Sequence, residues 1–194
     1  SLSRRFSSAV ESKIAQDLKR IDSILIGKPP VYKDDEQFEL TLDQLINKTF
    51  SAGDAFCKAV LSLMSYHQPK SFSNNSLVRI DNSWLKVAFS KNYHHFFPKA
   101  YLRKEGFFDY EANSIVNITI VDDHLNKREI GAKSPSTYMD TFKKVNDKLD
   151  KTMRSHLIDN IDLYGIWNDD YKTFLQQRGK KILRLLESRL HPKL

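Results

Sequence analysis

Residues 93–99 read YHHFFPK, and this short stretch decides how the rest of the chain is interpreted. Two adjacent histidines between aromatic residues favour a short strand that ends where Pro98 interrupts it. Neighbouring side chains on a regular strand point to opposite faces, so His94 and His95 can address one site only where the strand ends or bends. Because Pro98 supplies that end, we expect both imidazoles to reach one solvent-accessible cavity.

A second strand is expected further along the chain. Residues 114–121 read SIVNITIV and are rich in β-branched side chains, which favour extended backbone. Residues 123–130 then predict a short helix or turn that ends at Gly131. Together these segments predict a small strand–loop–strand–helix element.

Helical patterns flank this element on both sides. In the N-terminal half, apolar residues recur at three- or four-residue steps, which predicts helices over residues 6–25, 42–46 and 53–66. On the C-terminal side, Ser134 and Pro135 are typical first residues of a helix. Asn168 is expected to cap a long terminal helix, whose basic residues, Arg178 among them, are expected to form a solvated face.

The predicted fold class is therefore mostly α with a small β-hairpin (α+β). We expect one compact domain, in which a central core is flanked by helices at both ends. Its parts are a helical N-terminal part over residues 1–70, the core over residues 71–141 and a helical C-terminal part over residues 142–194.

Composition restricts the function classes. The 194 residues carry a net charge of +7, which favours polyanionic partners such as nucleic acid. The chain has no signal-peptide pattern and no run of about 18 apolar residues, and its one cysteine, Cys57, excludes an intrachain disulfide framework. These features predict a cytoplasmic protein. Because the first residue is Ser rather than Met, we expect a piece of a longer protein.

The order of the polar residues matches the needs of phosphodiester hydrolysis. That reaction requires a general base for water, a divalent ion that neutralises charge on the phosphate, and a group that orients the base. One histidine as base, one histidine and one asparagine on the metal, and one asparagine as positioner would meet all three needs. The chain offers His94, His95, Asn117 and Asn126 in this order.

The same residues carry a family resemblance. Residues 94–99 resemble the (D/H)H-I-x-P-K opening of HNH, or ββα-metal, nucleases, and Asn117 and Asn126 fall where that family has its central and final motif residues. Residues 92–102, 113–126 and 130–138 also resemble the C-terminal nuclease domain of GmrSD-type modification-dependent restriction endonucleases. The resemblance covers about three quarters of the chain and implies a ββα-metal HNH core between the flanking helices.

The resemblance also implies roles for these residues. His95 would be the general base, and His94, in a place often taken by Asp, would ligate the metal together with Asn126. Asn117 would hold the region of His95 in place, directly or through backbone contacts. The implied ion is Mg²⁺, although a nitrogen ligand moves the preference toward Mn²⁺, Ni²⁺ or Zn²⁺. Relatives of this branch carry an N-terminal nucleotide-dependent domain, which we expect in the missing half of the protein.

Basic residues around the motif are candidates for binding DNA phosphates, namely Lys99, Arg103, Lys127 and Arg128. A solvated basic surface is the competing interpretation. His124 is a rival to Asn126 as a ligand, and Phe107 and Phe108 are expected in the core rather than against bases. For the whole chain the alternatives are a catalytically inactive DNA-binding or assembly module and a nuclease that acts on RNA.

Overall fold

The computed structural model describes residues 10–31, 40–78, 80, 93–121 and 129–190. Within these ranges the chain is mostly helical and has one two-stranded antiparallel sheet, so the predicted α+β class is confirmed. The predicted residues His124, Asn126, Lys127 and Arg128, and most of the predicted helix over 123–130, lie outside the described residues.

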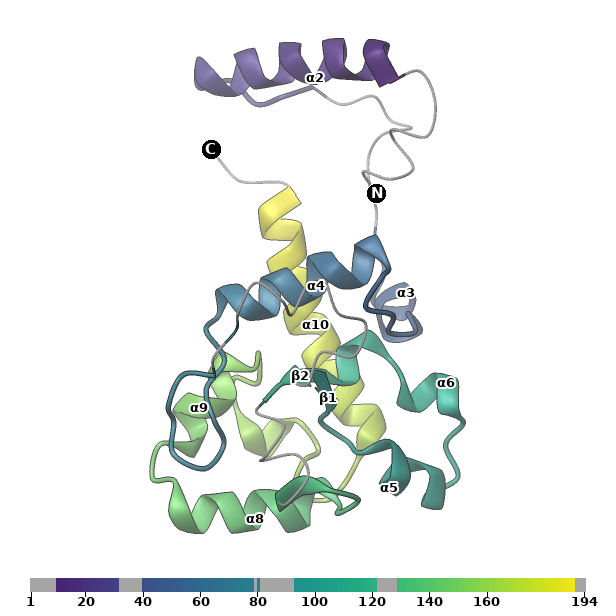
Figure 1. Ribbon diagram of the computed structural model, residues 1–194, viewed down its shortest axis with the longest axis vertical. Helices are drawn as coiled ribbons and strands as arrows, with labels where there is room; N and C mark the ends of the chain where they lie inside the picture. The colour runs from purple at the N-terminus through teal and green to yellow at the C-terminus, as the bar shows by residue number, and fades with distance from the viewer. Residues whose placement is uncertain (1–9, 32–39, 79, 81–92, 122–128, 191–194) are drawn as a thin grey trace.

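The elements follow one another along the chain as Figure 1 shows. In order they are α2 (Val10–Leu25), α3 (Leu42–Ile46), α4 (Ala55–Tyr66), β1 (Tyr93–His95), α5 (Lys99–Lys104), α6 (Asp109–Ala112), the 3-10 turn η2 (Ile115–Asn117), β2 (Ile118–Ile120), α8 (Pro135–Val145), α9 (Leu149–Ser155), the 3-10 turn η4 (Ile161–Leu163) and α10 (Tyr171–Leu190). The sheet lies near the middle of the body, with helices around it.

The sheet is shorter than the sequence pattern predicts. β1 pairs with β2 in the register Tyr93–Ile120, His94–Thr119 and His95–Ile118. The first half of the expected second strand is instead the turn η2, because the Ser114 hydroxyl accepts a hydrogen bond from the backbone N–H of Val116 and closes a tight turn. The expectation of a strand over residues 114–121 was therefore wrong for its first half.

The buried aromatic residues beside the sheet form the centre of the core. Phe96 and Phe97 are fully buried and directly follow β1. Phe96 stacks on Phe174 of α10, with ring centroids 4.8 Å apart, and Phe72 packs against Phe96 at 5.9 Å. This single hydrophobic cluster extends from Leu45 to Ile182 and so draws residues from all three predicted parts.

Helix α10 crosses α3 at close range because of one glycine. A Cβ atom built on Gly179 would lie 2.8 Å from Cδ1 of Leu42, so a larger residue would push the two helices apart. The helix begins later than predicted. Asp170, rather than Asn168, caps it by accepting a hydrogen bond from the N–H of Thr173 at 3.0 Å.

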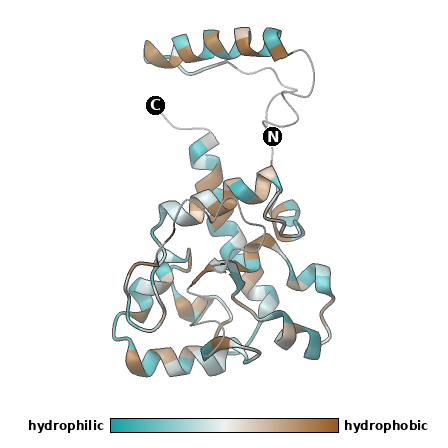
Figure 2. Ribbon diagram, viewed as in Figure 1, coloured by the Kyte–Doolittle hydropathy of each residue, from teal (hydrophilic) through white to brown (hydrophobic). Residues whose placement is uncertain are grey.

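The N-terminal helix α2 contributes nothing to the core, since none of its residues is buried. Its apolar stripe is visible in Figure 2 and includes Leu18 and Leu25, which are 56% and 76% exposed. Within the described ranges, no helix combines the length and the apolar character needed to cross a bilayer.

Candidate active site

His95 ends strand β1 at the point where the chain turns into the core. The backbone N–H of Phe96 donates to the carbonyl of Asn117 at 2.8 Å, which is the last link between the two segments before the chain bends. Phe96 and Phe97 are then anchored among the buried aromatic rings. The half-buried His95 is thus followed in the chain by Phe96 and Phe97, whose burial fixes the backbone on that side.

Asn117 holds the bend that follows His95. Its side chain is fully buried, and its Oδ1 accepts a hydrogen bond from the N–H of Phe97 at 2.8 Å. Its Nδ2 donates to the carbonyls of Phe97 and Ala112 at 3.0 and 2.9 Å. The sequence analysis expected backbone contacts of this kind, and the amide fixes the polypeptide two residues beyond His95.

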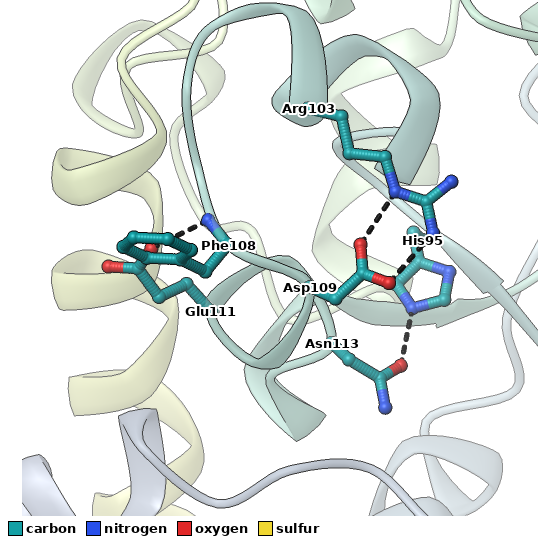
Figure 3. A network of polar contacts seen from close by, with 6 residues as sticks. All are labelled: His95, Arg103, Phe108, Asp109, Glu111 and Asn113. Atoms are coloured by element: carbon teal, nitrogen blue, oxygen red, sulfur yellow. Dashed lines mark hydrogen bonds and ion pairs between the residues drawn. The ribbon is translucent and has the colours of Figure 1, made fainter.

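Asn113 makes the direct contact with the imidazole. Its Nδ2 donates to the carbonyl of Phe50 at 3.1 Å, so its Oδ1 is left to accept. That oxygen lies 2.9 Å from Nε2 of His95, and the bond is drawn in Figure 3. A neutral imidazole has one donor and one acceptor nitrogen. Nε2 must therefore carry the proton, and Nδ1 keeps the lone pair that can act as a base.

The surroundings keep this ring neutral. Burial lowers the pKa of His95 to about 4, although its hydrogen bond to Asn113 acts in the opposite direction. Electrostatic interaction with Lys99 and His94 lowers the pKa further. At neutral pH the ring is accordingly unprotonated, which is the form that a general base requires.

His94 occupies the neighbouring position on the strand and is half-buried. The register opposes it to Thr119, so a regular strand would turn His94 and His95 toward opposite faces. Electrostatic interaction with His94 lowers the pKa of His95, as is expected for neighbouring residues whichever way their rings point. Convergence of both imidazoles with Asn126 stays a prediction, because Asn126 lies outside the described residues.

Arg178 supports the same strand from the core, although the sequence analysis expected it on a solvated face. Its side chain is fully buried, and NH1 donates to the carbonyls of Val116 and Ile118 at 2.6 and 2.7 Å. These two residues bracket Asn117. Burial lowers the pKa of Arg178 to about 10, so the guanidinium is still charged at neutral pH and binds these carbonyls firmly.

The predicted phosphate-binding residues differ in their surroundings. Arg103 is exposed, but its Nε and NH2 groups donate to the two carboxylate oxygens of Asp109 at 2.6 and 2.8 Å (Figure 3). Its charge is therefore compensated in the free protein. Lys99 is the first residue of α5 and is half-buried. Its positive charge lowers the pKa of His95.

The position of Asn113 in the sequence did not predict a role for it. Asn113 lies two residues before the turn η2, and Asn117 is the last residue of that turn. An asparagine at the end of a short helix is usually a cap, however, and only the fold brings its amide to His95.

Among the described residues, no group of three or more His, Cys, Asp or Glu side chains could hold a metal ion. The predicted ligand pair is of a different kind, one histidine and one asparagine. Of this pair the described residues contain His94, whose imidazole nitrogen is a suitable donor for a borderline divalent cation.

Comparison with known proteins gives one relative. No family model matches the chain, and no solved structure does. The chain is similar to "Uncharacterized protein MJ0686" of Methanocaldococcus jannaschii, with 25% identity over 213 aligned residues that cover 95% of this chain and 35% of the relative. The chain therefore spans about one third of the length of that protein.

Proposed function

We propose that the chain is a metal-dependent nuclease of the ββα-metal type that hydrolyses DNA phosphodiester bonds. It would be the cutting part of a cytoplasmic restriction or phage-defence protein. One observation carries the proposal. A neutral histidine at the end of a strand is held through Nε2 by Asn113, and this leaves Nδ1 as the basic atom.

The residues of the site divide the work. His95 Nδ1 takes a proton from water as the water oxygen attacks phosphorus, and the P–O ester bond to the leaving sugar oxygen breaks with its electron pair on that oxygen. The imidazolium that forms is stabilised because its Nε2–H already donates to the Asn113 oxygen, and a hydrogen bond from a charged donor is stronger. Asn117 keeps the backbone beyond His95 from shifting during this transfer. A bound phosphate would raise the pKa of His95 from about 4 toward the operating pH, because a nearby negative charge favours the imidazolium.

His94 and Asn126 would hold the divalent ion, most simply Mg²⁺, with Mn²⁺, Ni²⁺ or Zn²⁺ as alternatives. When bound, the ion would supply charge neutralisation at the phosphate and at the leaving oxygen. Lys99 would hold a neighbouring phosphate, as would Lys127 and Arg128. Arg103 would join them once it leaves Asp109.

The test is cleavage of a plasmid with Mg²⁺, Mn²⁺ or Ni²⁺ by the wild type beside His95→Ala. His67→Ala is the matched control, since His67 lies at the C-terminus of α4 and outside the proposed site. We expect cutting by the wild type and by the control, and none by His95→Ala. Equal cutting by all three, or no cutting of either the plasmid or single-stranded DNA with any metal, would exclude this active site.

The rival functions separate in the same assay. A catalytically inactive DNA-binding module would bind the plasmid without cutting it, and an RNA-directed nuclease would cut an RNA of the same sequence instead. The net charge of +7 favours a nucleic-acid partner in each case.

A further inference from the structure

Two aromatic side chains at the start of α6 are exposed to an unusual degree. Phe108 and Tyr110 are 66% and 63% exposed. Their rings lie almost parallel, with an interplanar angle of 10° and centroids 5.8 Å apart. This is the offset stacking that aromatic pairs prefer, and it presents two flat surfaces side by side to solvent.

Folding does not explain this pair. Phe108 occupies the N-cap of α6, a position that favours Ser, Thr, Asp or Asn. The preceding Phe107 is the ring that packs inward, edge-on to Tyr171 at 5.2 Å. The expectation that Phe107 and Phe108 both lie in the core was therefore wrong for Phe108. Leaving a phenylalanine in water costs apolar burial, which points to a use outside the fold.

The position of the pair links it to the candidate site. Helix α6 carries Tyr110 and leads directly to Asn113, the residue bonded to His95. In Figure 3, Phe108 and His95 lie apart, with Asp109 and Asn113 between them. A ligand that reaches His95 along this helix would pass the two rings and the guanidinium of Arg103.

We propose that Phe108 and Tyr110 form a stacking platform for an unpaired DNA base next to the cleaved phosphodiester. This inference rests on the proposed nuclease function and narrows its substrate to DNA with a single-stranded stretch or an extruded base. The argument is chemical complementarity. A base is a flat aromatic ring that extends a stack of two, whereas a base within a duplex already has both faces covered.

Among the residues that the structure describes, the other strongly exposed ring does not offer the same surface. Tyr66 is 67% exposed, but the guanidinium of Arg189 lies 4.4 Å from the centre of its ring. The nearby cations suit the same ligand, because Lys99 and Arg103 of α5 can follow the phosphates of a strand whose base rests on the platform.

The experiment measures binding by the full chain in EDTA, so that no cleavage occurs. The probes are a labelled single-stranded oligonucleotide, a strand of equal length and charge made of abasic units, and a blunt duplex. The variants are Phe108→Leu with Tyr110→Leu, which keeps apolar bulk without rings, and Phe108→Tyr with Tyr110→Phe, which keeps the rings. Tyr66→Leu is the control for loss of an exposed ring elsewhere.

We expect the double leucine variant to bind the base-bearing strand about 5- to 100-fold more weakly. Its binding of the abasic strand should be unchanged, and the ring-preserving variant and the control should match the wild type. An equal loss on both strands, no loss, or no single-strand binding by the wild type would overturn the platform. Stacking-dependent binding by a wild type that cuts no DNA with any metal would exclude the nuclease and retain the platform. Metal-dependent cleavage by the wild type, with normal binding of the base-bearing strand by the double leucine variant, would exclude the platform and retain the nuclease.

Discussion

His95 is a half-buried imidazole and His156 a buried one, and their hydrogen bonds differ in the way that the catalytic role proposed for His95 requires. Burial lowers the pKa of His95 to about 4 and that of His156 to about 3. Both nitrogens of His156 are occupied, since Nδ1 accepts from the Thr119 hydroxyl at 2.8 Å and Nε2 donates to the Lys70 carbonyl at 2.7 Å. For His95 the described residues provide a partner for Nε2 alone, and that partner is Asn113.

The comparison teaches that a lowered pKa does not identify a catalytic histidine. His156 is neutral because it is buried. Its two hydrogen bonds join α9 to β2 and to the loop after α4, and its ring lies edge-on to Phe72 at 4.8 Å. His95 is equally neutral but keeps a nitrogen that the described residues leave available. The two rings differ in how many of their nitrogens have a hydrogen-bond partner among the described residues. Mutations can test whether this difference matters for function.

The largest effect is expected from His95→Ala. Loss of a general base should lower the cleavage rate by about 10²- to 10⁴-fold, with little change in thermal stability because the ring is half-buried at the end of a strand. His156→Ala should do the opposite and lower the free energy of unfolding by about 2–3 kcal/mol, since it empties a packed site and leaves two buried polar groups unpaired. Cleavage rates read beside urea denaturation of both variants test this. A stable His156→Ala with a larger rate defect than His95→Ala would reverse the assignment.

Asn113 should have the next largest effect. Asn113→Ala removes the acceptor that orients His95, and we expect a loss of about 10- to 100-fold in rate, as for groups that orient metal ligands. Asn113→Asp instead places a carboxylate against Nε2, which raises the pKa of His95. The acid limb of its pH–rate profile should therefore move to higher pH. Asn113 would be structural only if both variants kept the wild-type profile after correction for the folded fraction.

These variants also mark what the sequence alone could predict. Residue type and order predicted the histidine pair, the end of the strand at Pro98 and the backbone contacts of Asn117. Asn113 was not predicted, because its contact with His95 depends on η2, which Ser114 creates where β-branched residues favour a strand. Arg178 was missed for a similar reason. Only the crossing of α10 over η2 and β2 shows that this cation binds carbonyls instead of water.

Titration should distinguish the two histidines by a smaller effect, a difference in pKa between the two rings. Both folded-state pKa values lie below the ordinary value of 6.5, at about 4 and about 3. The unfolded chain then binds protons first as the pH falls below about 6.5, so the free energy of unfolding should decline from there and continue to decline through about 3. Ring resonances followed by NMR should give a midpoint near 4 for His95 and a lower one for His156. A His95 midpoint near 6.5 in the metal-free protein would contradict the neutral-base scheme.

The smallest expected effect concerns the rim of the site. Asp109 holds the guanidinium of Arg103 through two short hydrogen bonds on an exposed surface. Asp109→Asn should release this charge toward DNA, strengthen binding by a few fold, and steepen the dependence of affinity on salt by about one released counterion. The fold should hardly change, because an ion pair on an exposed surface contributes little to stability. Asp140→Asn is the matched control, since Asp140 pairs with Lys144 in an exposed bridge on α8. Equal strengthening by both variants would indicate a general charge effect, and Arg103 would then have no place in the interface. A gain confined to Asp109→Asn would place the DNA backbone along α5, where Arg103 lies.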